Sequence, residues 1–198
     1  MGQYYTPILR KPLANKHYKN STFYSHEYDN GLKLMEHSYF ENNFVNAVCN
    51  ALVDNPQKVI WLGDYTDSGM ALRLTKKQIV FLHSVAVDKR FRIEPTEQNQ
   101  KFDWNEQWYL INDTKRTYID LKQYIEKAPH AFKNWYNGEK WVIHPLPLLT
   151  ASSNGMGGGD YNGDDDAVGT WCNDILYISK EKPVADYSEV CYYFQKQG

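Results

Sequence analysis

The chain has 198 residues, with 22 Lys and Arg against 24 Asp and Glu, and an aromatic content of 8 Phe, 6 Trp and 16 Tyr. This length fits one domain. A 42% apolar share with so many aromatics excludes an intrinsically disordered protein. The net charge of −2 removes the long-range attraction on which general nucleic-acid binders depend.

Cysteine spacing and hydropathy indicate a cytoplasmic protein. Cys49, Cys172 and Cys191 are far apart and form no CxxC pair, so neither a disulfide framework nor a thiolate zinc site is expected. No stretch approaches the roughly 18 apolar residues that cross a bilayer, and the N-terminus lacks the apolar region of a signal peptide. We therefore expect no membrane association.

Hydrophobic periodicity and turn residues predict the elements of the first half of the chain. In chain order these are a strand at 3–9 with Pro7 at a sheet edge or early strand end, a basic, flexible hairpin loop at 10–21, an extended piece at 23–26, a helix from 42 or 43 to 54 capped by Asn, a central strand at 59–62, and a loop at 63–69.

The second half predicts more strands than helices. Its elements are a strand or helix at 78–87, a hairpin of 107–112 and 117–121, a short helical region at 122–134 broken at Pro129, an extended piece at 141–144, a flexible glycine-rich loop at 152–167, and strands within 168–179 and 189–194. The whole chain, residues 1–198, therefore reads as a single α+β domain with a mainly antiparallel sheet and one or two packed helices.

The first candidate for chemistry is Gly63-Asp64-Tyr65-Thr66-Asp67, directly after a strand. It resembles the GDYVDRG element of metal-dependent phosphoprotein phosphatases, whose first Asp bridges two metal ions. Two-metal chemistry needs several fixed ligands for each ion. The Asp-x-His and Gly-Asn-His elements that would complete this set are missing from the sequence. The alternative is a tight turn in which Asp64 binds backbone amides.

The second candidate is the glycine-rich, acidic segment 154–166. Asp160, Asn162 and Asp164 have the i, i+2, i+4 spacing with which a loop presents oxygen ligands to Ca²⁺. The twelfth position is Trp171 instead of Glu, which excludes an EF-hand. A looser site for Ca²⁺ or Mg²⁺ stays open, beside a solvated acidic loop or one that a partner orders.

The glycines of this segment permit a third interpretation. Gly155, Gly157, Gly158 and Gly159 could let backbone N–H groups approach a phosphate or ribose. The segment has neither the Gly-Lys-Ser/Thr of a Walker motif nor the helix that follows a dinucleotide fingerprint. The acidic residues after it would also repel a phosphate.

Several short motifs together resemble an uncharacterised family of hypothetical proteins from phage and gut-bacterial genomes. They are Gly2-Gln3-Tyr4-Tyr5, Tyr24-Ser25-His26, Asn30-Gly31-Leu32-Lys33-Leu34-Met35-Glu36, Gly63-Asp64-Tyr65, Tyr109-Leu110-Ile111-Asn112, Tyr118-Ile119-Asp120-Leu121, Asn154-Gly155-Met156-Gly157-Gly158-Gly159-Asp160 and Val168-Gly169-Thr170-Trp171-Cys172-Asn173-Asp174. In the last motif Cys172-Asn173 departs from the family's Ala-Gly. The resemblance implies a phage or prophage setting, a bacterial host cytoplasm and a counter-defence role.

The leading functional hypothesis is a non-catalytic binding protein that captures a nucleotide-like small molecule or a host protein. Its pocket would be edged by two Gly-Asp loops, with the binding residues Gly63, Asp64, Tyr65, Asp67, Asn154, Gly157, Gly158, Gly159 and Asp160. The alternatives are a metal-dependent phosphoester hydrolase using Asp64, Asp67, Asp160 and Asp164, and a structural or virion-associated protein. The oligomeric state stays open. Partners are also to be sought at two charged patches, the basic Arg10, Lys11, Lys16 and Lys19 and the acidic Asp160 and Asp164 to Asp166.

Overall fold

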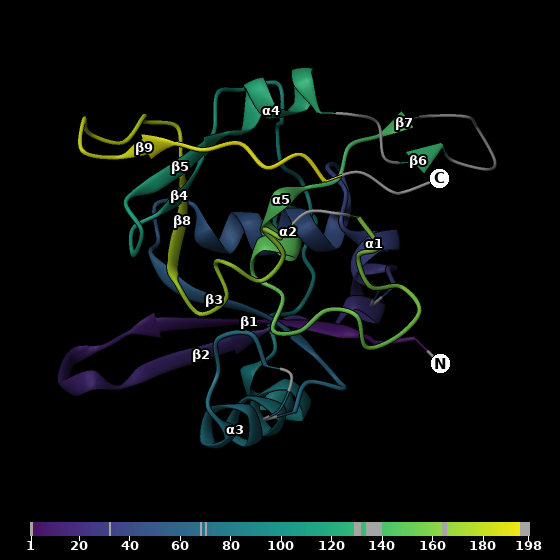
Figure 1. Cartoon of the computed structure of the whole chain (residues 1–198). Helices are drawn as coiled ribbons and strands as arrows, with labels where there is room; N and C mark the ends of the chain where they lie inside the picture. The colour runs from purple at the N-terminus through teal and green to yellow at the C-terminus, as the bar shows by residue number, and fades with distance from the viewer. Residues whose placement is uncertain are drawn as a thin grey trace.

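The computed structural model describes residues 2–31, 33–67, 69, 71–128, 132–133, 140–163 and 166–194. Within these ranges seven strands form one sheet in the order β2-β1-β3-β8-β4-β5-β9, and only the β5–β9 pair is parallel (Figure 1). The strands are β1 Tyr5–Pro12, β2 Tyr18–Thr22, β3 Gln57–Gly63, β4 Tyr109–Asn112, β5 Thr117–Asp120, β8 Ile175–Ser179 and β9 Ser188–Glu189. Two short strands, β6 Phe132–Lys133 and β7 Lys140–Trp141, pair separately.

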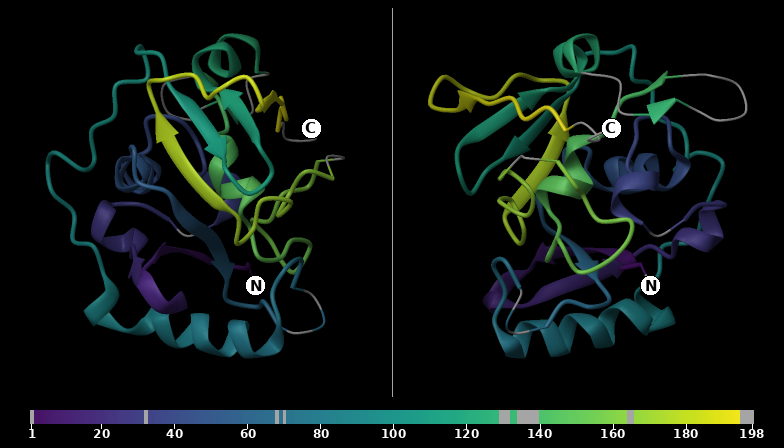
Figure 2. Two further views of the ribbon diagram at one scale, coloured as in Figure 1. Left: turned by 90° about the vertical axis from the view of Figure 1, so that its left-hand side faces the viewer. Right: turned by 45° about the vertical axis from the view of Figure 1, so that its right-hand side comes forward.

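Helices cover both faces of the sheet. They are α1 Leu34–His37, α2 Asn43–Leu52, α3 Lys76–Val87, α4 Leu121–Lys127 and α5 Pro145–Leu149, with 3-10 turns at Ala14–Lys16, Ser25–Tyr28 and Lys89–Phe91. The α3 helix lies along the outer side of β1 and β2, whereas α2 and α5 lie on the opposite side, in the middle of the molecule (Figure 2). This arrangement confirms the predicted α+β class, single domain and mainly antiparallel sheet.

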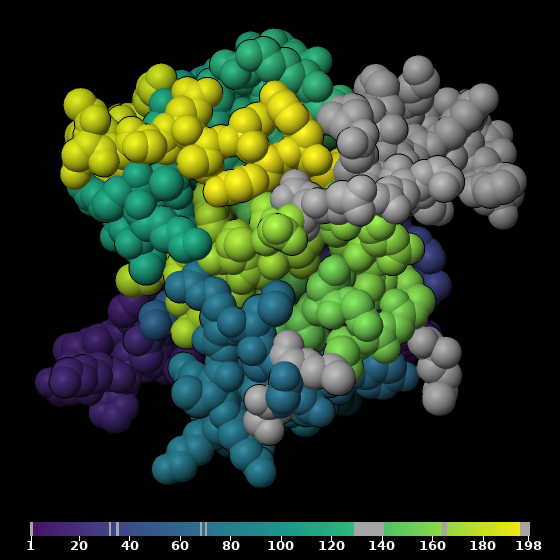
Figure 3. All heavy atoms as spheres, viewed as in Figure 1, coloured from purple at the N-terminus to yellow at the C-terminus, as the bar shows by residue number. Residues whose placement is uncertain are grey.

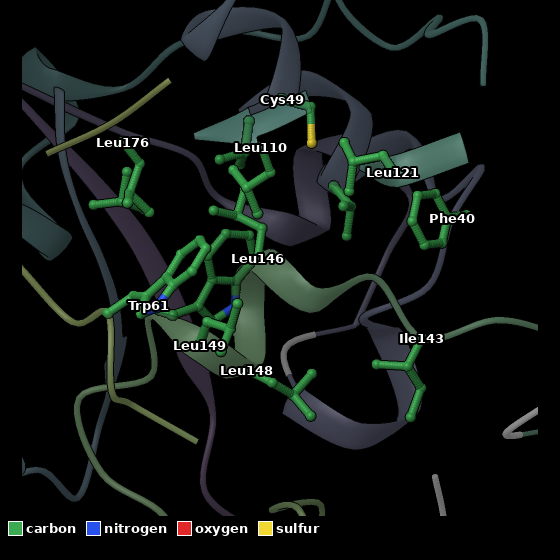
Figure 4. Close-up of a cluster of buried hydrophobic side chains, with 14 of the residues drawn as sticks. Phe40, Cys49, Trp61, Leu110, Leu121, Ile143, Leu146, Leu148, Leu149 and Leu176 are labelled. Carbon is green, nitrogen blue, oxygen red and sulfur yellow. The ribbon is translucent and has the colours of Figure 1, made fainter. Parts of the chain in front are cut away.

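Side chains of β1 and β3 alternate between two cores, as the period of two in a strand requires. Tyr5 and Leu9 enter the larger core with α2 and α5, while Ile8 enters the smaller core under α3. The larger core includes Trp61 of β3 and Leu146 of α5 (Figure 4). The central strands are therefore buried on both faces.

Several predicted elements are confirmed. The α2 helix begins after Asn42, whose side chain accepts hydrogen bonds from the amides of Phe44 and Val45. The hairpin of β4 and β5 and the central strand β3 also lie where the sequence places them. The ambiguous segment 78–87 is helical, because Thr75 and Gln78 form a capping box at the start of α3.

Other predictions were wrong in detail. Most of the segment 10–21 is regular strand, since β1 continues to Pro12 and β2 begins at Tyr18. Segment 23–26 leads into a 3-10 turn, and within 168–179 regular strand is confined to β8. Regular strand near the C-terminus covers only Ser188–Glu189. The predicted break at Pro129 lies outside the described residues.

Pro7 was expected at a sheet edge or at an early strand end, yet it lies inside β1. The register places Pro7 opposite Trp61 of β3, while pairing with β2 extends only from Ile8 to Pro12. Trp61 directs its own amide and carbonyl away from β1, toward Thr150 and Ser152. The backbone nitrogen of Pro7 therefore points to the edge of β1 that β2 no longer pairs with. The N–H that proline lacks removes no hydrogen bond between strands there.

Candidate functional site

The loop at 63–67, here called the Gly63 loop, is fixed to the N-terminal segment. Tyr5 lies opposite Gly63 in the β1–β3 register. One residue further, the Asp64 amide donates to the Tyr4 carbonyl at 2.8 Å, and the Tyr4 amide donates to Asp64 Oδ1 at 2.9 Å. Asp64 therefore binds a backbone amide, as the turn interpretation predicts.

A short extended segment places the glycine-rich residues beside the Gly63 loop. Because β8 pairs with β3 only at Gln57 and Lys58, and Val59 bonds the backbone of residues 173–174 just before β8, the edge of β3 beyond Val59 is open to another partner. Residues 150–152 occupy it: the Trp61 amide donates to the Thr150 carbonyl at 2.8 Å, and the Ser152 amide donates to the Trp61 carbonyl at 2.9 Å. Segments about 90 residues apart in the chain are thus paired in the interior, and the blue and green segments that follow them adjoin on the face shown in Figure 3.

Residues 154–161, here called the Asn154 loop, close on themselves. The Asn154 side chain accepts from the Tyr161 amide at 2.9 Å and donates to the Tyr161 carbonyl at 3.0 Å. Within the loop, Asp160 Oδ2 accepts from the amides of Met156 at 2.6 Å and Gly157 at 3.1 Å. The Asn and Asp of the motif therefore shape this loop.

A buried polar network joins the two loops through β1. The Tyr5 hydroxyl donates to Asp160 Oδ1 at 2.7 Å, and Gln3 Nε2 donates to Ser153 Oγ at 2.9 Å. Burial and the neighbouring carboxylate raise the pKa of Tyr5, so its hydroxyl stays protonated and donates. The network continues from the hydroxyl of Ser153 to that of Thr66 at 2.7 Å, from Thr66 to Ser152 at 2.6 Å, and from the Gly63 amide to Ser152 Oγ at 2.9 Å.

Close approach explains two of the glycines. A Cβ atom on Gly2 would lie 2.3 Å from the Gly158 carbonyl oxygen, with which Gly2 forms a backbone bridge. A Cβ atom on Gly63 would lie 2.4 Å from the Gln3 amide nitrogen. The N-terminal motif, the Gly-Asp-Tyr motif and the Asn-Gly-x-Gly-Gly-Gly-Asp motif therefore meet at one place.

The outer surface where these three motifs meet is exposed and carries both aromatic and acidic side chains. Tyr4 and Tyr65 are 45% and 37% exposed, and Asp64 and Asp67 are exposed beside them. A Cβ atom built on Gly158 meets no atom within 4 Å, so the backbone there can be approached closely. Asp160, in contrast, is buried and faces inward.

Of the residues predicted to hold a metal ion, the structure describes Asp160 and Asn162. Both oxygens of Asp160 accept hydrogen bonds from the protein, Asn162 is exposed, and Asp164 lies outside the described residues. Asp64 lies on the surface, bound to the Tyr4 amide. Within the part of the chain that the structure describes, no group of three or more His, Cys, Asp or Glu could hold a metal ion.

Five members of the network are not among the predicted site residues: Gln3, Tyr5, Thr66, Ser152 and Ser153. All five are at most 3% exposed. The first three stand inside motifs that the sequence singles out, and the serines directly precede Asn154. Buried polar side chains are generally hydrogen-bonded. The two serines between an apolar run and a glycine run are therefore the feature of the sequence that could have indicated a buried hydrogen-bond network.

The last of the family motifs, residues 168–174, is bonded to the sheet through Asp174. Asp174, which is 2% exposed, accepts from Asn112 Nδ2 at 2.9 Å and forms an ion pair with Arg73 at 2.9 Å.

Among the described residues, no helix has the length and apolar character that a membrane span requires. Comparison with protein-family models, with curated proteins and with solved structures found no match.

Proposed function

We propose that the protein is a non-catalytic binding protein, and that the surface formed by the Gly63 loop and the Asn154 loop captures a host protein. The observation that carries the proposal is the buried network, which holds the two loops side by side against β1. A surface held by buried hydrogen bonds is pre-organised, which lowers the entropic cost of binding.

The exposed groups of this surface favour a protein partner over a nucleotide. Tyr4 and Tyr65 offer large, rigid contact areas with a polar tip, the type of residue enriched at binding interfaces. Asp64 and Asp67 make the rim negative, which repels a phosphate and attracts a basic partner surface. A nucleotide-like ligand is therefore the weaker alternative at this surface.

The hydrogen bonds of the carboxylates support binding over phosphoester hydrolysis. A two-metal hydrolase needs carboxylate oxygens free for ions. Asp160 uses both of its oxygens to hold Met156, Gly157 and Tyr5. Asp64 uses one oxygen to hold the Tyr4 amide.

The resemblance to phage and gut-bacterial proteins implies the biological context in which the proposed binding would occur. A phage- or prophage-encoded protein that captures a host protein in the bacterial cytoplasm would act in counter-defence. The host lysate is therefore the source in which to look for the partner.

The test is affinity capture from a bacterial host lysate with quantitative mass spectrometry. Wild-type protein is compared with Tyr65→Ala and Tyr4→Ala, which remove the exposed rings. Phe81→Ala is the matched control, because Phe81 is 44% exposed but belongs to α3. We expect one host protein to be retained by the wild type and the control, and to be depleted about tenfold or more by each tyrosine variant.

Equal capture by all four proteins would contradict the proposal. A parallel thermal-shift screen with nucleotides and cyclic nucleotides tests the weaker alternative. A rise in Tm that Tyr65→Ala abolishes would replace the protein partner by a small molecule.

A further inference from the structure

The hairpin of β1 and β2 brings two lysines together at the opposite end of β1 from the loops. Its register places Lys11 directly opposite Lys19. The hairpin projects from the body of the molecule (Figures 1 and 3, purple, left). Like charges directly opposite each other on paired strands are destabilising, so an anion bound between them would stabilise this pair.

No compensating carboxylate is present among the described residues, where neither lysine has an ion pair or a hydrogen bond to a side chain. The sequence explains this, since residues 1–26 contain four Lys and Arg and no Asp or Glu. The neighbouring Arg10 differs, because it stacks on the Tyr18 ring at 4.4 Å. Lys11 and Lys19 are both exposed, and their charges remain available.

A cavity of about 210 Å³ adjoins this lysine pair. Ser21 of β2 lines it, and the Ser21 hydroxyl has no hydrogen-bond partner within the described part of the chain. Asn55 and Gln57 line it from the other side, each fixed by donating to the Ala51 carbonyl at 2.8 Å. The cavity thus combines two free cations, a free hydroxyl and two oriented amides.

We propose that this cavity binds the phosphate group of a small phosphomonoester. A phosphate carries two negative charges at neutral pH and several acceptor oxygens, which match the two ammonium groups and the Ser21 hydroxyl. The volume exceeds the roughly 30 Å³ share of one water and falls below the roughly 300–1,000 Å³ of sites for drug-sized ligands. It therefore suits a phosphate with a small attached group.

This site is separate from the host-protein surface, and its test is independent of that proposal. The probes are inorganic phosphate and glycerol 3-phosphate, titrated into ¹⁵N-labelled protein at constant ionic strength with chloride as the balancing anion. We expect saturable shifts of the Lys11, Lys19 and Ser21 amides. Lys11→Gln/Lys19→Gln should weaken both probes about tenfold or more, because charge-assisted hydrogen bonds are lost.

The matched control is Lys76→Gln/Lys122→Gln, which removes two charges from α3 and α4. It should leave the affinity unchanged. Ser21→Ala, which changes no charge, should weaken binding severalfold. Absence of saturable shifts in the wild type, or equal weakening by the control, would overturn the proposal.

Thermal unfolding separates loss of binding from loss of folding. Without phosphate, Lys11→Gln/Lys19→Gln should have a Tm equal to or above that of the wild type, because the like-charge pair is removed. Phosphate should raise the Tm of the wild type and not that of the variant. If duplex DNA competes for the site more strongly than glycerol 3-phosphate does, the site serves a nucleic-acid backbone and the small-molecule proposal is wrong.

Discussion

The hydroxyl of Tyr5 connects β1 to the Asn154 loop. It donates to Asp160, and its oxygen accepts from Gln3 Nε2. Asp160 in turn holds the amides of Met156 and Gly157. The neighbouring Tyr4 points to solvent, so adjacent tyrosines have a structural and a surface role.

Tyr5→Phe should lower the free energy of unfolding by about 2–3 kcal/mol, because it leaves a buried carboxylate without one of its donors. Urea unfolding followed by circular dichroism measures the change. Tyr4→Phe is the matched control and should stay within about 0.5 kcal/mol of the wild type. Equal losses in the two variants would contradict the role assigned to Tyr5.

Gly159 and Gly158 make a second matched pair. Gly159 has φ of +96°, and a Cβ atom there would lie 2.6 Å from Cδ of Lys33, whereas Gly158 has open space. Gly159→Ala should therefore cost about 1–3 kcal/mol of unfolding free energy, and Gly158→Ala less than about 0.5 kcal/mol. Chemical denaturation checks both; a Gly158 variant as unstable as the Gly159 variant would be inconsistent with this loop conformation.

Among the elements, α5 is a helix that the sequence did not predict. The predicted extended piece ends at 144, and residues 145–149 contain two prolines, which usually end a helix. Here Pro145 occupies the first turn, where a missing N–H costs nothing, and His144 Nδ1 caps the helix by accepting from the Leu146 amide at 3.1 Å. The His144 proton therefore resides on Nε2, which faces Cys49 Sγ at 3.6 Å.

His144 gives the fold a defined pH dependence. Complete burial lowers the pKa of His144 to about 3, against about 6.5 in the unfolded chain. Between these values the unfolded chain binds a proton that the folded protein does not. The stability contributed by neutral His144 is thus fully present above pH 6.5 and is lost as the pH falls toward 3.

The measurement is urea unfolding of the wild type and of His144→Asn, which keeps a capping side chain and removes the titration. Relative to the variant, the wild type should lose about 2 kcal/mol between pH 6.5 and pH 5. Parallel pH profiles for the two proteins would show that His144 is not buried in the neutral form.

Elements with local signals were predictable, and elements stabilised by tertiary contacts were not. The Asn cap of α2 and the polar turn between β4 and β5 are encoded within a few residues. The arms of the β1–β2 hairpin are polar because they project into solvent, so they read as a loop. The strand pairs in that segment, from Arg10–Asn20 to Pro12–Tyr18, lie within the hairpin, and of this segment only Arg10 also pairs with β3.

At the scale of the whole molecule, the candidate site could be predicted only in part. The sequence singles out both glycine-rich loops, but their proximity follows from the register that sets Tyr5 opposite Gly63 and from the open edge of β3 beside Thr150 and Ser152. These pairings join residues about 60 and 90 positions apart. The single strand β1 consequently connects an acidic, tyrosine-bearing surface at one end with a basic cavity at the other.

Hydrogen exchange of the Tyr5→Phe variant, followed amide by amide under native conditions, tests most directly whether the two loops form one unit. We expect exchange of the Gly63, Met156 and Gly157 amides to accelerate together, while the amides of α2 keep their protection, since local opening exposes cooperative units. Faster exchange in the Asn154 loop with no change at Gly63 would contradict the joining of the loops by the network, because the loops would then open independently.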